Sequence, residues 1–252
     1  MPSLASAVPG KALPAWDANR LLALLAPADR AVLAPDLRAV PLNRGDVLHD
    51  SGDIIEHVYF PLSGMISLLT VMRSGEAIET GIVGHEGIIG ATAGLGSRFA
   101  SDRATVQIPG TAARLKASRF RVAVSRSSSI REVVARYSEL LTAQIQQSAA
   151  CNILHGVEAR LCRWLLQAHD HARSDSLPLT QEFMAQMLGV RRTTVTAVAQ
   201  ALQSARLIQY RRGHIQIANR KGLEESACEC YATLRARAQG ILAASAVTTR
   251  TG

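Results

Sequence analysis

The sequence predicts an α+β protein with an antiparallel β-rich N-terminal domain, one long helix and a compact C-terminal unit of helices and a β-hairpin. Three observations support this fold class. Short runs of β-forming residues separated by turn residues fill 38–108, as in a small antiparallel barrel or sandwich. Apolar residues recur every three or four positions over 130–155, which indicates an amphipathic helix. Two helical segments joined at a glycine and followed by two short strands occupy 179–217, the pattern of a helix-turn-helix with a hairpin after it.

The composition is that of a globular protein rather than a secreted, fibrous or membrane protein. Of the 252 residues, 48% are hydrophobic and 19% are charged, and the length suggests about two domains. No run approaches the roughly 18 consecutive apolar residues that a membrane span needs. The first thirty residues lack the basic segment and the apolar segment of a signal peptide. We therefore expect a cytoplasmic protein without a membrane partner.

Basic residues are concentrated in one short window of the C-terminal half. The formal net charge is +8, and 176–221 contain seven basic side chains against a single acidic one, Glu182. The basic residues of this window are Arg191, Arg192, Arg206, Arg211, Arg212, Arg220 and Lys221. A local excess of positive charge attracts polyanions, and no basic amphipathic helix of the membrane-binding kind accompanies it. Nucleic acid is the expected partner.

The N-terminal elements follow from local signals. Residues 1–15 are rich in Ala, Pro and Ser and are expected to be disordered. Asp17 is a suitable N-cap for a short helix that Pro27 would end. Strands are expected at 57–61, 65–72 and 77–83. Twelve of the 18 glycines precede residue 111, as a turn-rich β domain requires, and we place this domain at 16–127.

A long helix is expected at 128–155, longer than most helices of globular proteins. A helix of this length often pairs with its twin in a homodimer; the alternative is a helix packed on the β domain of its own chain. The expected dimer interface consists of Val134, Tyr137, Leu141, Ile145, Ser148 and Cys151. Gly156 ends the helix, and the C-terminal domain is placed at 156–238. Residues 239–252 are expected to form a flexible tail.

The segment 179–217 carries the most specific signals. Thr180 can cap a first helix, Gly189 suits the turn that follows it, and a second helix is expected over about 191–204. In a helix-turn-helix the second helix places its N-terminal side chains against base edges in the major groove. The residues expected to contact DNA from these helices are Thr180, Gln181, Arg191, Arg192, Thr193, Thr194, Thr196 and Gln200. A structural helical hairpin with a solvated basic face is the alternative.

A β-hairpin follows the second helix. Strand-like residues 207–210 and 214–217 flank a turn, which we interpret as a three-residue loop with Gly213 in the left-handed position. The DNA contacts expected from this hairpin are Arg211, Arg212 and His214. The two arginines would reach adjacent phosphates, and such contacts position a protein without selecting a sequence. A final helix is expected over 222–237 and would pack in the core.

No group of residues predicts catalysis or metal binding. The four cysteines have neither the paired CxxC spacing of zinc sites nor the run of an iron–sulfur site; they are Cys151, Cys162, Cys228 and Cys230. We expect reduced thiols packed as small apolar residues; the alternative is a redox-active Cys228-x-Cys230 pair. The sequence His169-Asp170-His171 resembles a metal pair, but neighbours two apart on a helix point to different sides. No enzyme activity, metal or cofactor is therefore expected.

The run from Leu179 to Val198 looks like the helix-turn-helix of the Crp/Fnr transcription regulators. The best-matching positions are Gly189, Arg192, Thr194 and Val195. Less specific matches to the β-roll of this family are the turns Gly52–Asp53 and Ser63–Gly64 and the run Glu86–Gly90. The resemblance implies a β-roll or jelly-roll sensor domain of the cyclic-nucleotide-binding type, a dimerisation helix and a winged helix-turn-helix. It also implies a cytoplasmic homodimer that binds a palindromic promoter site on double-stranded DNA and acts with RNA polymerase.

The sequence departs from the cyclic-AMP-binding members of this family. The resemblance assigns to an effector pocket the residues Gly90, Ala91, Arg103 and Ala104. Ala91 stands where these members have a glutamate that binds the ribose, which argues against cyclic AMP. Arg103 stands at the phosphate-binding position, but it can pair instead with Asp102 or Glu86. The iron–sulfur members need an N-terminal cysteine cluster, and no cysteine precedes Cys151, so no such cluster is expected.

The recognition helix departs from the best-known members as well. Arg192 is retained and is expected to contact one guanine, whereas Thr193 and Ala197 replace the family's glutamate and second arginine. The sequence favours a dimeric DNA-binding transcription regulator. The alternative is a ligand-binding sensory module that acts through protein contacts and no longer binds DNA. The clustered arginines of 191–212 argue against that alternative.

Overall fold

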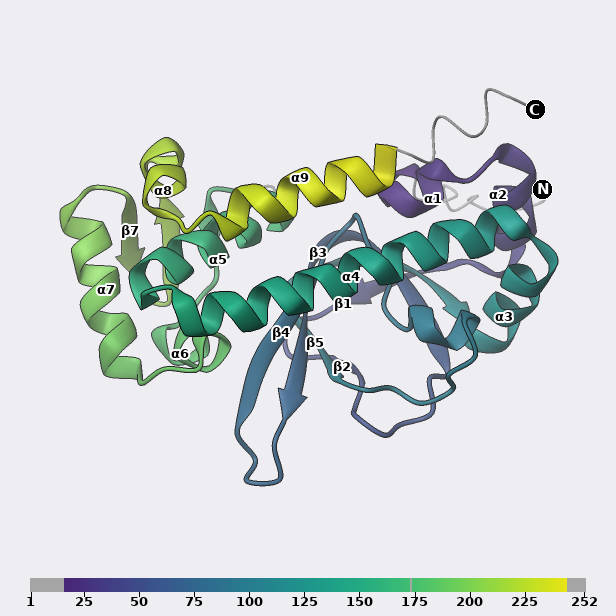
Figure 1. The fold of residues 1–252 in the computed structure, drawn as a ribbon, viewed down its shortest axis with the longest axis horizontal. Coiled ribbons are helices and arrows are strands. Elements are labelled where there is room, and N and C mark those ends of the chain that lie inside the picture. Colours follow the sequence, from purple (N-terminus) through teal and green to yellow (C-terminus); the bar gives the residue numbers. More distant parts are fainter. Residues whose placement is uncertain (1–15, 173, 244–252) are drawn as a thin grey trace, which may run out of the picture.

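The computed structural model describes residues 16–172 and 174–243 (Figure 1). The segment 1–15 and residues 244–252 of the expected tail lie outside the described residues. A β-rich domain lies against one long helix, and a smaller domain of helices and a hairpin lies at the C-terminal end of that helix. No helix of the described ranges has the length and apolar character that a bilayer crossing requires.

The N-terminal domain opens with short helices: η1 (Trp16–Ala18), α1 (Arg20–Leu24), α2 (Pro27–Leu33) and η2 (Ala34–Asp36). The cap of α1 is Asn19 rather than Asp17. The Asn19 side-chain oxygen accepts hydrogen bonds from two N–H groups of α1 at 3.0 and 3.2 Å. Its amide donates to two carbonyls of the β domain, both at 2.9 Å. Pro27 begins α2 instead of only ending α1, because a proline in the first helical position loses no hydrogen bond.

The β domain is an antiparallel sheet built from β1 (Arg38–Leu42), β2 (Val47–His49), β3 (His57–Val71), β4 (Ala77–Val83) and β5 (Arg103–Lys116). The strand order is β1-β5-β3-β4, and β2 also pairs with β5. The expected strands 57–61 and 65–72 are one strand, β3, because register shifts around Ser63 bend it without ending its pairing with β5. Gly64 lies in this bend with φ +87°, and a Cβ there would lie 2.6 Å from the Ile108 carbonyl oxygen.

Two helices pack on the β domain, α3 (Ala117–Arg126) and α4 (Ser128–Leu154), and both contact the short helix η3 (Ala91–Gly94). The Ser127 side chain caps α4 by accepting a hydrogen bond from the Ile130 N–H at 3.1 Å. The largest buried side chains of this core include Phe60, Ile66, Leu115 and Phe120. The long helix therefore packs on the β domain of its own chain.

This packing corrects the expected dimer interface. Four of the six expected residues are no more than 8% exposed within the single chain: Val134, Tyr137, Ser148 and Cys151. Val134 and Tyr137 belong to the core of the β domain, so they cannot meet a second copy. Leu141 is half-buried, and Ile145 is 38% exposed. Helical periodicity identifies residues that share a face, but here the chain itself covers most of that face.

The C-terminal domain consists of α5 (Val157–Ala172), β6 (Ser176–Leu177), α6 (Gln181–Leu188), α7 (Arg192–Ser204), β7 (Ile208–Arg211), β8 (His214–Ile217) and α8 (Arg220–Ser226). Its small antiparallel sheet has the order β6-β8-β7. The core of this domain includes Trp164, Leu165, Val195 and Ile215, all 0–1% exposed. The domain also contacts the β-roll, because α6 packs on β4 and α5 on β3.

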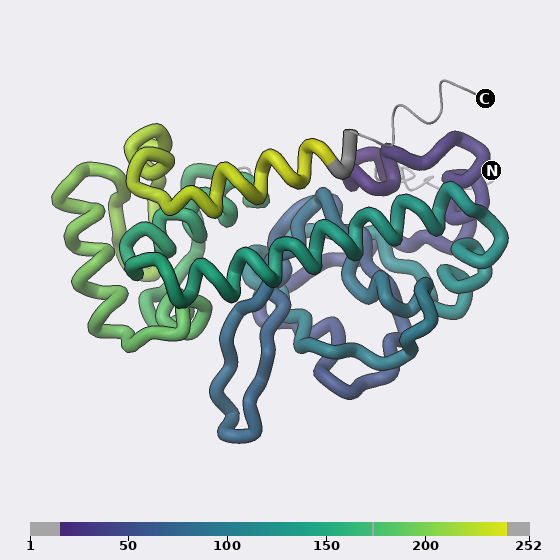
Figure 2. The backbone as a smooth tube through the Cα atoms, in the orientation of Figure 1, coloured from purple at the N-terminus to yellow at the C-terminus, as the bar shows by residue number. Residues whose placement is uncertain are grey.

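The chain ends with α9 (Cys230–Ala243), which runs back along α4 toward the N-terminal domain (Figure 2). The single helix expected over 222–237 is thus two helices, because Ala227 adopts an extended conformation after α8. The expectation of a flexible tail over 239–252 is also wrong for 239–243, because α9 continues to Ala243. Packing on α4 explains this length, which the local sequence does not specify.

Candidate DNA-binding surface

Helices α6 and α7 form the helix-turn-helix expected from the sequence. The Thr180 side chain caps α6 by accepting a hydrogen bond from the Phe183 N–H at 3.2 Å. Gly189 ends α6 in the left-handed conformation with φ +63°, which a glycine adopts at little cost. The inward faces of both helices are buried, with Met184, Leu188, Val195 and Leu202 no more than 2% exposed. This packing fixes the direction in which the start of α7 points.

The N-terminal turn of α7 is exposed and polar. Arg191, Arg192 and Thr193 are exposed there, and Gln200 is exposed two turns further along. The Arg192 Nε atom lies 3.9 Å from a Glu182 carboxylate oxygen, and both side chains are at least 66% exposed. A solvent-exposed pair of this kind contributes at most about 1 kcal/mol. Arg192 can therefore exchange this partner for a phosphate or a base.

Three expected DNA contacts have roles within the protein. The Thr196 hydroxyl donates to the Gln181 side-chain oxygen at 2.7 Å and so joins α7 to α6. Thr180 uses its hydroxyl oxygen to cap α6. These side chains are half-buried, as is Thr194. Their interactions orient α7, and the exposed residues of its first turn are better placed to contact DNA.

The hairpin β7–β8 has a tighter turn than the sequence interpretation proposed. Arg211 pairs with His214, so the loop contains two residues, Arg212 and Gly213, and not three. Both have positive φ, +48° and +79°, which is typical of a type I′ turn. Gly213 is in the left-handed conformation as expected, while Arg212 adopts it without being a glycine. The three predicted wing residues, Arg211, Arg212 and His214, are exposed.

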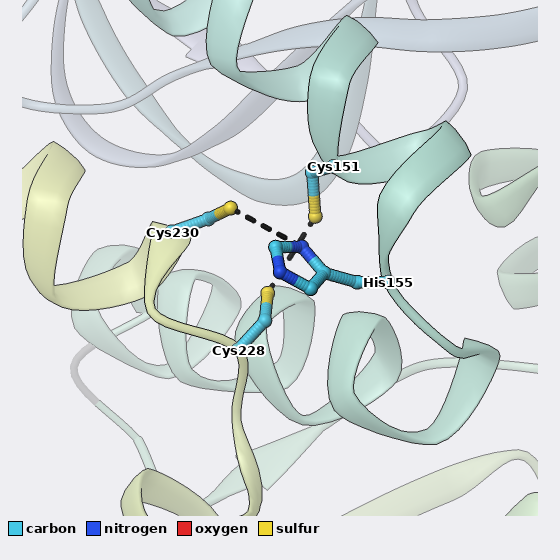
Figure 3. A group of neighbouring side chains, drawn as sticks. All are labelled: Cys151, His155, Cys228 and Cys230. Carbon is cyan, nitrogen blue, oxygen red and sulfur yellow. Dashed lines mark hydrogen bonds between the residues drawn. The ribbon is translucent and has the colours of Figure 1, made fainter.

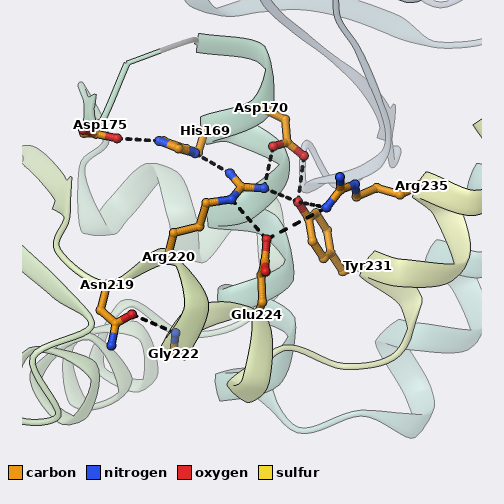
Figure 4. A network of polar contacts seen from close by, with 9 residues as sticks. All are labelled: His169, Asp170, Asp175, Asn219, Arg220, Gly222, Glu224, Tyr231 and Arg235. Carbon is orange, nitrogen blue, oxygen red and sulfur yellow. Dashed lines mark hydrogen bonds and ion pairs between the residues drawn. The ribbon is translucent and has the colours of Figure 1, made fainter.

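One member of the basic window belongs to an internal network instead (Figure 4). Arg220 lies 2.8 Å from an Asp170 carboxylate oxygen and 3.1 Å from a Glu224 oxygen, and it also donates to the Tyr231 hydroxyl at 2.6 Å. It further contacts His169, the first histidine of the His169-Asp170-His171 run. These contacts join α5, α8 and α9. The charge of Arg220 is thus compensated inside the domain and adds little to the DNA-binding surface.

A buried carboxylate connects the two domains, which sequence reasoning did not anticipate. Glu79 of β4 accepts hydrogen bonds from the Trp164 Nε1 of α5 at 2.7 Å and from the Ser67 hydroxyl. Burial raises the pKa of Glu79 to about 7, although these hydrogen bonds oppose the rise. Nearby, His171 lies 3.3 Å from Glu86 of the β-roll. Burial raises the pKa of Glu86, but the charge and hydrogen bond of His171 outweigh this effect and lower it to about 2.

The expected effector pocket lies between the β-roll and α4 and has a volume of about 210 Å³. Gly90 and Ala91 line it, together with α4 residues that include Ser138, Leu141 and Thr142. Its volume is below the roughly 300–1,000 Å³ of most small-molecule pockets. The α4 residues lining it occupy the side of the helix turned toward the β-roll.

The other two expected pocket residues do not line this cavity. Arg103 forms a two-pronged ion pair with Asp50, with Nε–Oδ1 at 3.1 Å and Nη2–Oδ2 at 2.6 Å. Its hydrogen bond to Asp50 lowers the pKa of that carboxyl. Asp102, considered as a partner of Arg103, interacts with His49 instead. Ala104 is fully buried, so neither side chain reaches into the pocket.

This arrangement defines a class of protein, in which a sensor-type β-roll is joined by a long helix to a winged helix-turn-helix. The model of the cyclic nucleotide-binding domain matches residues 39–127, and that of the Crp-like helix-turn-helix domain matches residues 159–226. Together the two models match more than half of the chain. The chain belongs to the Crp/Fnr family of DNA-binding transcription regulators.

Solved structures share this fold. FixK2 from Bradyrhizobium japonicum has a TM-score of 0.65 and 13% identity over 76% of this chain and 98% of that one. TTHB099, a CRP-family transcriptional regulator from Thermus thermophilus, has a TM-score of 0.64 and 18% identity over 75% and 96%. TTHA1359, a CRP/FNR-family regulator from the same organism, gives 0.62 and 22% over 75% and 98%. No curated protein sequence matches the chain. At these identities the likeness concerns the fold alone.

Proposed function

We propose that the protein is a homodimer that places α7 in the major groove of a two-fold symmetric promoter site. The observation that carries this proposal is the exposed, positively charged start of α7 beside the equally exposed arginines of the β7–β8 wing. In a winged helix-turn-helix the recognition helix contacts base edges, and arginine favours guanine there. Arg192 would contact a base, while Arg212 would bind a phosphate.

A second copy is proposed to pair along the side of α4 that faces away from the chain's own core. Ala149 and Ile153 are one turn apart near the C-terminal end of α4, and both are exposed. Ile153 and its neighbour Leu154 are 84% and 76% exposed. Such apolar residues on one long helix support association through that helix. The interface is thus proposed on different residues from those that periodicity first suggested.

Sedimentation tests this interface. Ile153→Asp is expected to produce monomers, because two carboxylates would be brought together in an apolar contact. Val122→Asp is the matched control, since Val122 is a 44% exposed apolar residue on α3. Dimers that persist in Ile153→Asp would contradict the proposed interface.

The β-roll is proposed to bind an effector other than cyclic AMP, or to support the dimer without one. Ala91 supplies no ribose acceptor, and Arg103 is already paired with Asp50. As in other promoter-binding regulators, the complex on DNA is proposed to act through RNA polymerase in the cytoplasm. No catalytic role is proposed for this chain, and TTHB099 and TTHA1359, which share its fold, are transcriptional regulators.

The experiment is selection of binding sites from random duplex DNA with purified, ligand-free full-length protein at moderate salt. We expect enrichment of a two-fold site whose half-site centres lie about 34 Å apart. Selection with the Arg192→Ala variant should lose one base preference in each half-site. If neither ligand-free protein nor protein supplied with cell metabolites enriches any sequence, the alternative of a sensory module acting through protein contacts is favoured.

A further inference from the structure

Four side chains from distant parts of the sequence meet where α4 ends and α9 begins (Figure 3). We call them the Cys₃His cluster: Cys151, His155, Cys228 and Cys230. Cys151 lies in the last turn of α4, and His155 is the residue that caps the end of this helix, with its backbone N–H bonded to the Cys151 carbonyl. The two other cysteines lie in the α8–α9 connection and at the start of α9. The three sulfur atoms and one histidine nitrogen all lie within 4.8 Å of one another.

The distances within the Cys₃His cluster suit a single tetrahedral ion. The Sγ atoms of Cys151 and Cys228 are 3.5 Å apart, and the Cys230 Sγ lies 3.6 Å from His155 Nδ1. Zinc bonds of about 2.3 Å to sulfur and about 2.0 Å to nitrogen place tetrahedral ligand atoms about 3.5–3.8 Å apart. These two pairs therefore already have nearly the separation that a bound zinc ion would impose, and the other pairs lie within 4.8 Å.

We propose that the Cys₃His cluster binds one zinc ion as a closed, structural site. Each cysteine would bind as a thiolate and release its proton to solvent, and His155 would bind through the neutral Nδ1. Three soft sulfur ligands favour zinc over magnesium, calcium or manganese. A [4Fe–4S] cluster binds its thiolates on separate iron atoms, and the close approach of all four donors leaves space for one ion only.

The surroundings supply the charge and the hydrogen bonding that such a site needs. Three thiolates and one Zn²⁺ carry a net charge of −1. Arg160 is only 5% exposed and forms no carboxylate ion pair within the described part of the chain. Its guanidinium donates to the side-chain oxygen of Asn152, the residue after Cys151, at 2.9 Å and to the Leu188 carbonyl. Both acceptors are uncharged, so the anionic zinc site would supply the opposite charge that a buried guanidinium requires. Gln147 also donates a hydrogen bond from its amide to Cys230 Sγ at 3.0 Å, as partners of metal ligands commonly do.

The position of the cluster suggests what the ion would do. His155 lies two residues before the start of α5, and Cys228 lies two residues after the end of α8, so all of α5–α8 lies between ligands of the same ion. A single zinc ion would tie both ends of the helix-turn-helix domain to the end of α4. It would thereby restrict how that domain turns relative to the long helix. Metal binding itself does not depend on the proposed function.

Metal analysis of full-length protein, purified without chelators from zinc-containing medium, tests the proposal. We expect about one zinc per chain. After chelation, added Co²⁺ should give the visible bands of a tetrahedral site and the near-ultraviolet charge-transfer bands of cobalt–thiolate bonds. Added zinc should abolish both sets of bands. This measurement needs no variant and so does not depend on a mutant's folding.

Variants identify the ligands. Cys228→Ala and His155→Ala should each weaken zinc affinity by more than about 100-fold, because partners of ligands alone contribute about 10–100-fold. The matched control is Cys162→Ala, which removes the fourth cysteine from the buried face of α5 and should keep full zinc content. Burial raises the pKa of the Cys162 thiol to about 12. His155→Cys should retain zinc and strengthen the cobalt–thiolate bands.

Three results would overturn the proposal. One is protein that contains no metal and shows no cobalt bands when reduced. A second is a Cys151–Cys228 disulfide found by mass spectrometry in freshly purified, metal-free protein that reduction does not enable to bind zinc. The third is a brown protein containing iron and inorganic sulfide, which would assign these cysteines to an iron–sulfur cluster.

Discussion

The arginines of the helix-turn-helix domain and the arginine expected in the β-roll pocket have opposite surroundings. On α7 and the wing, Arg191, Arg192 and Arg212 are exposed, and Arg192 has only a distant, solvent-exposed carboxylate near it. In the β-roll, Arg103 is held by both oxygens of Asp50. An arginine is available to a phosphate only where no carboxylate already neutralises it. The proposed DNA-binding surface thus carries positive charge without a close carboxylate partner, whereas the charge of Arg103 is compensated by Asp50.

The largest expected effect concerns the contact that joins these two regions, Glu79 with Trp164. Glu79→Gln should remove part of the pH dependence of stability. Between its ordinary pKa of 4.5 and about 7, folded protein keeps a proton on Glu79 that unfolded chain releases. The free energy of unfolding therefore falls as pH rises through this window, by about 3 kcal/mol. A glutamine can accept from Trp164 through its oxygen and donate to the Ser67 hydroxyl through its amide nitrogen, and it does not titrate.

Thermal unfolding at pH 5 and pH 8 measures this effect. The variant should lose less stability than the wild type between the two pH values. Glu76→Gln changes an exposed carboxylate of the same hairpin and should behave as the wild type does. Equal pH profiles for Glu79→Gln and the wild type would show that the two domains are not joined by a protonated carboxyl.

Arg192→Ala should cost about 1–3 kcal/mol of DNA binding and relax specificity at one base pair of each half-site. Arg103→Ala sharpens the comparison, because it removes an arginine that does not face DNA and should leave the binding profile unchanged. Quantitative binding of both variants to a panel of single-base changes in the selected site measures this difference between Arg192→Ala and Arg103→Ala. An unaltered profile for Arg192→Ala would remove this residue from base recognition.

Arg212→Gly should weaken binding to all sequences alike and lower the magnitude of the salt slope by about one for each wing that contacts DNA. Glycine suits the left-handed conformation at this position, so the hairpin should remain folded. Arg212→Lys keeps the charge and should keep the slope. A loss confined to particular sequences would mean that the wing reads bases.

The smallest effect is expected at Asp50. Asp50→Asn frees Arg103, and because the pair is more than one-third exposed it should cost less than about 1 kcal/mol of stability. Inorganic phosphate should then raise the Tm of this variant more than that of the wild type. Asp102→Asn, whose carboxylate partners His49, is the control. If phosphate raises the Tm of the wild type by the same amount, the ion pair with Asp50 does not prevent Arg103 from binding phosphate.

Local sequence predicted the elements of both regions but not the contacts that cross between them. Thr180, Gly189 and the apolar spacing of α6 and α7 act over a few residues, so the helix-turn-helix follows from the sequence alone. Glu79 meets Trp164 across 85 positions, and only the packing of two domains brings them together.

The cysteines and α4 illustrate the same limit. Cys151 and Cys228 meet across 77 positions, and no short motif contains both. The spacing of Cys151 and His155, one helical turn apart, was a usable signal, but it becomes informative only beside a second pair of ligands. For α4, periodicity identified a buried face without indicating whether the same chain or a second copy covers it.

The most direct test of the central claim is the dependence of duplex binding on salt concentration. If Arg191, Arg211 and Arg212 of both subunits bind phosphates, affinity should fall steeply with salt, with a log–log slope of about −3 to −5. Replacing Arg191, Arg192, Arg211 and Arg212 together by alanine should reduce most of that slope, while Arg103→Ala should leave it intact. Binding that is insensitive to salt, or a slope unchanged in the fourfold variant, would contradict the assignment of this surface to DNA.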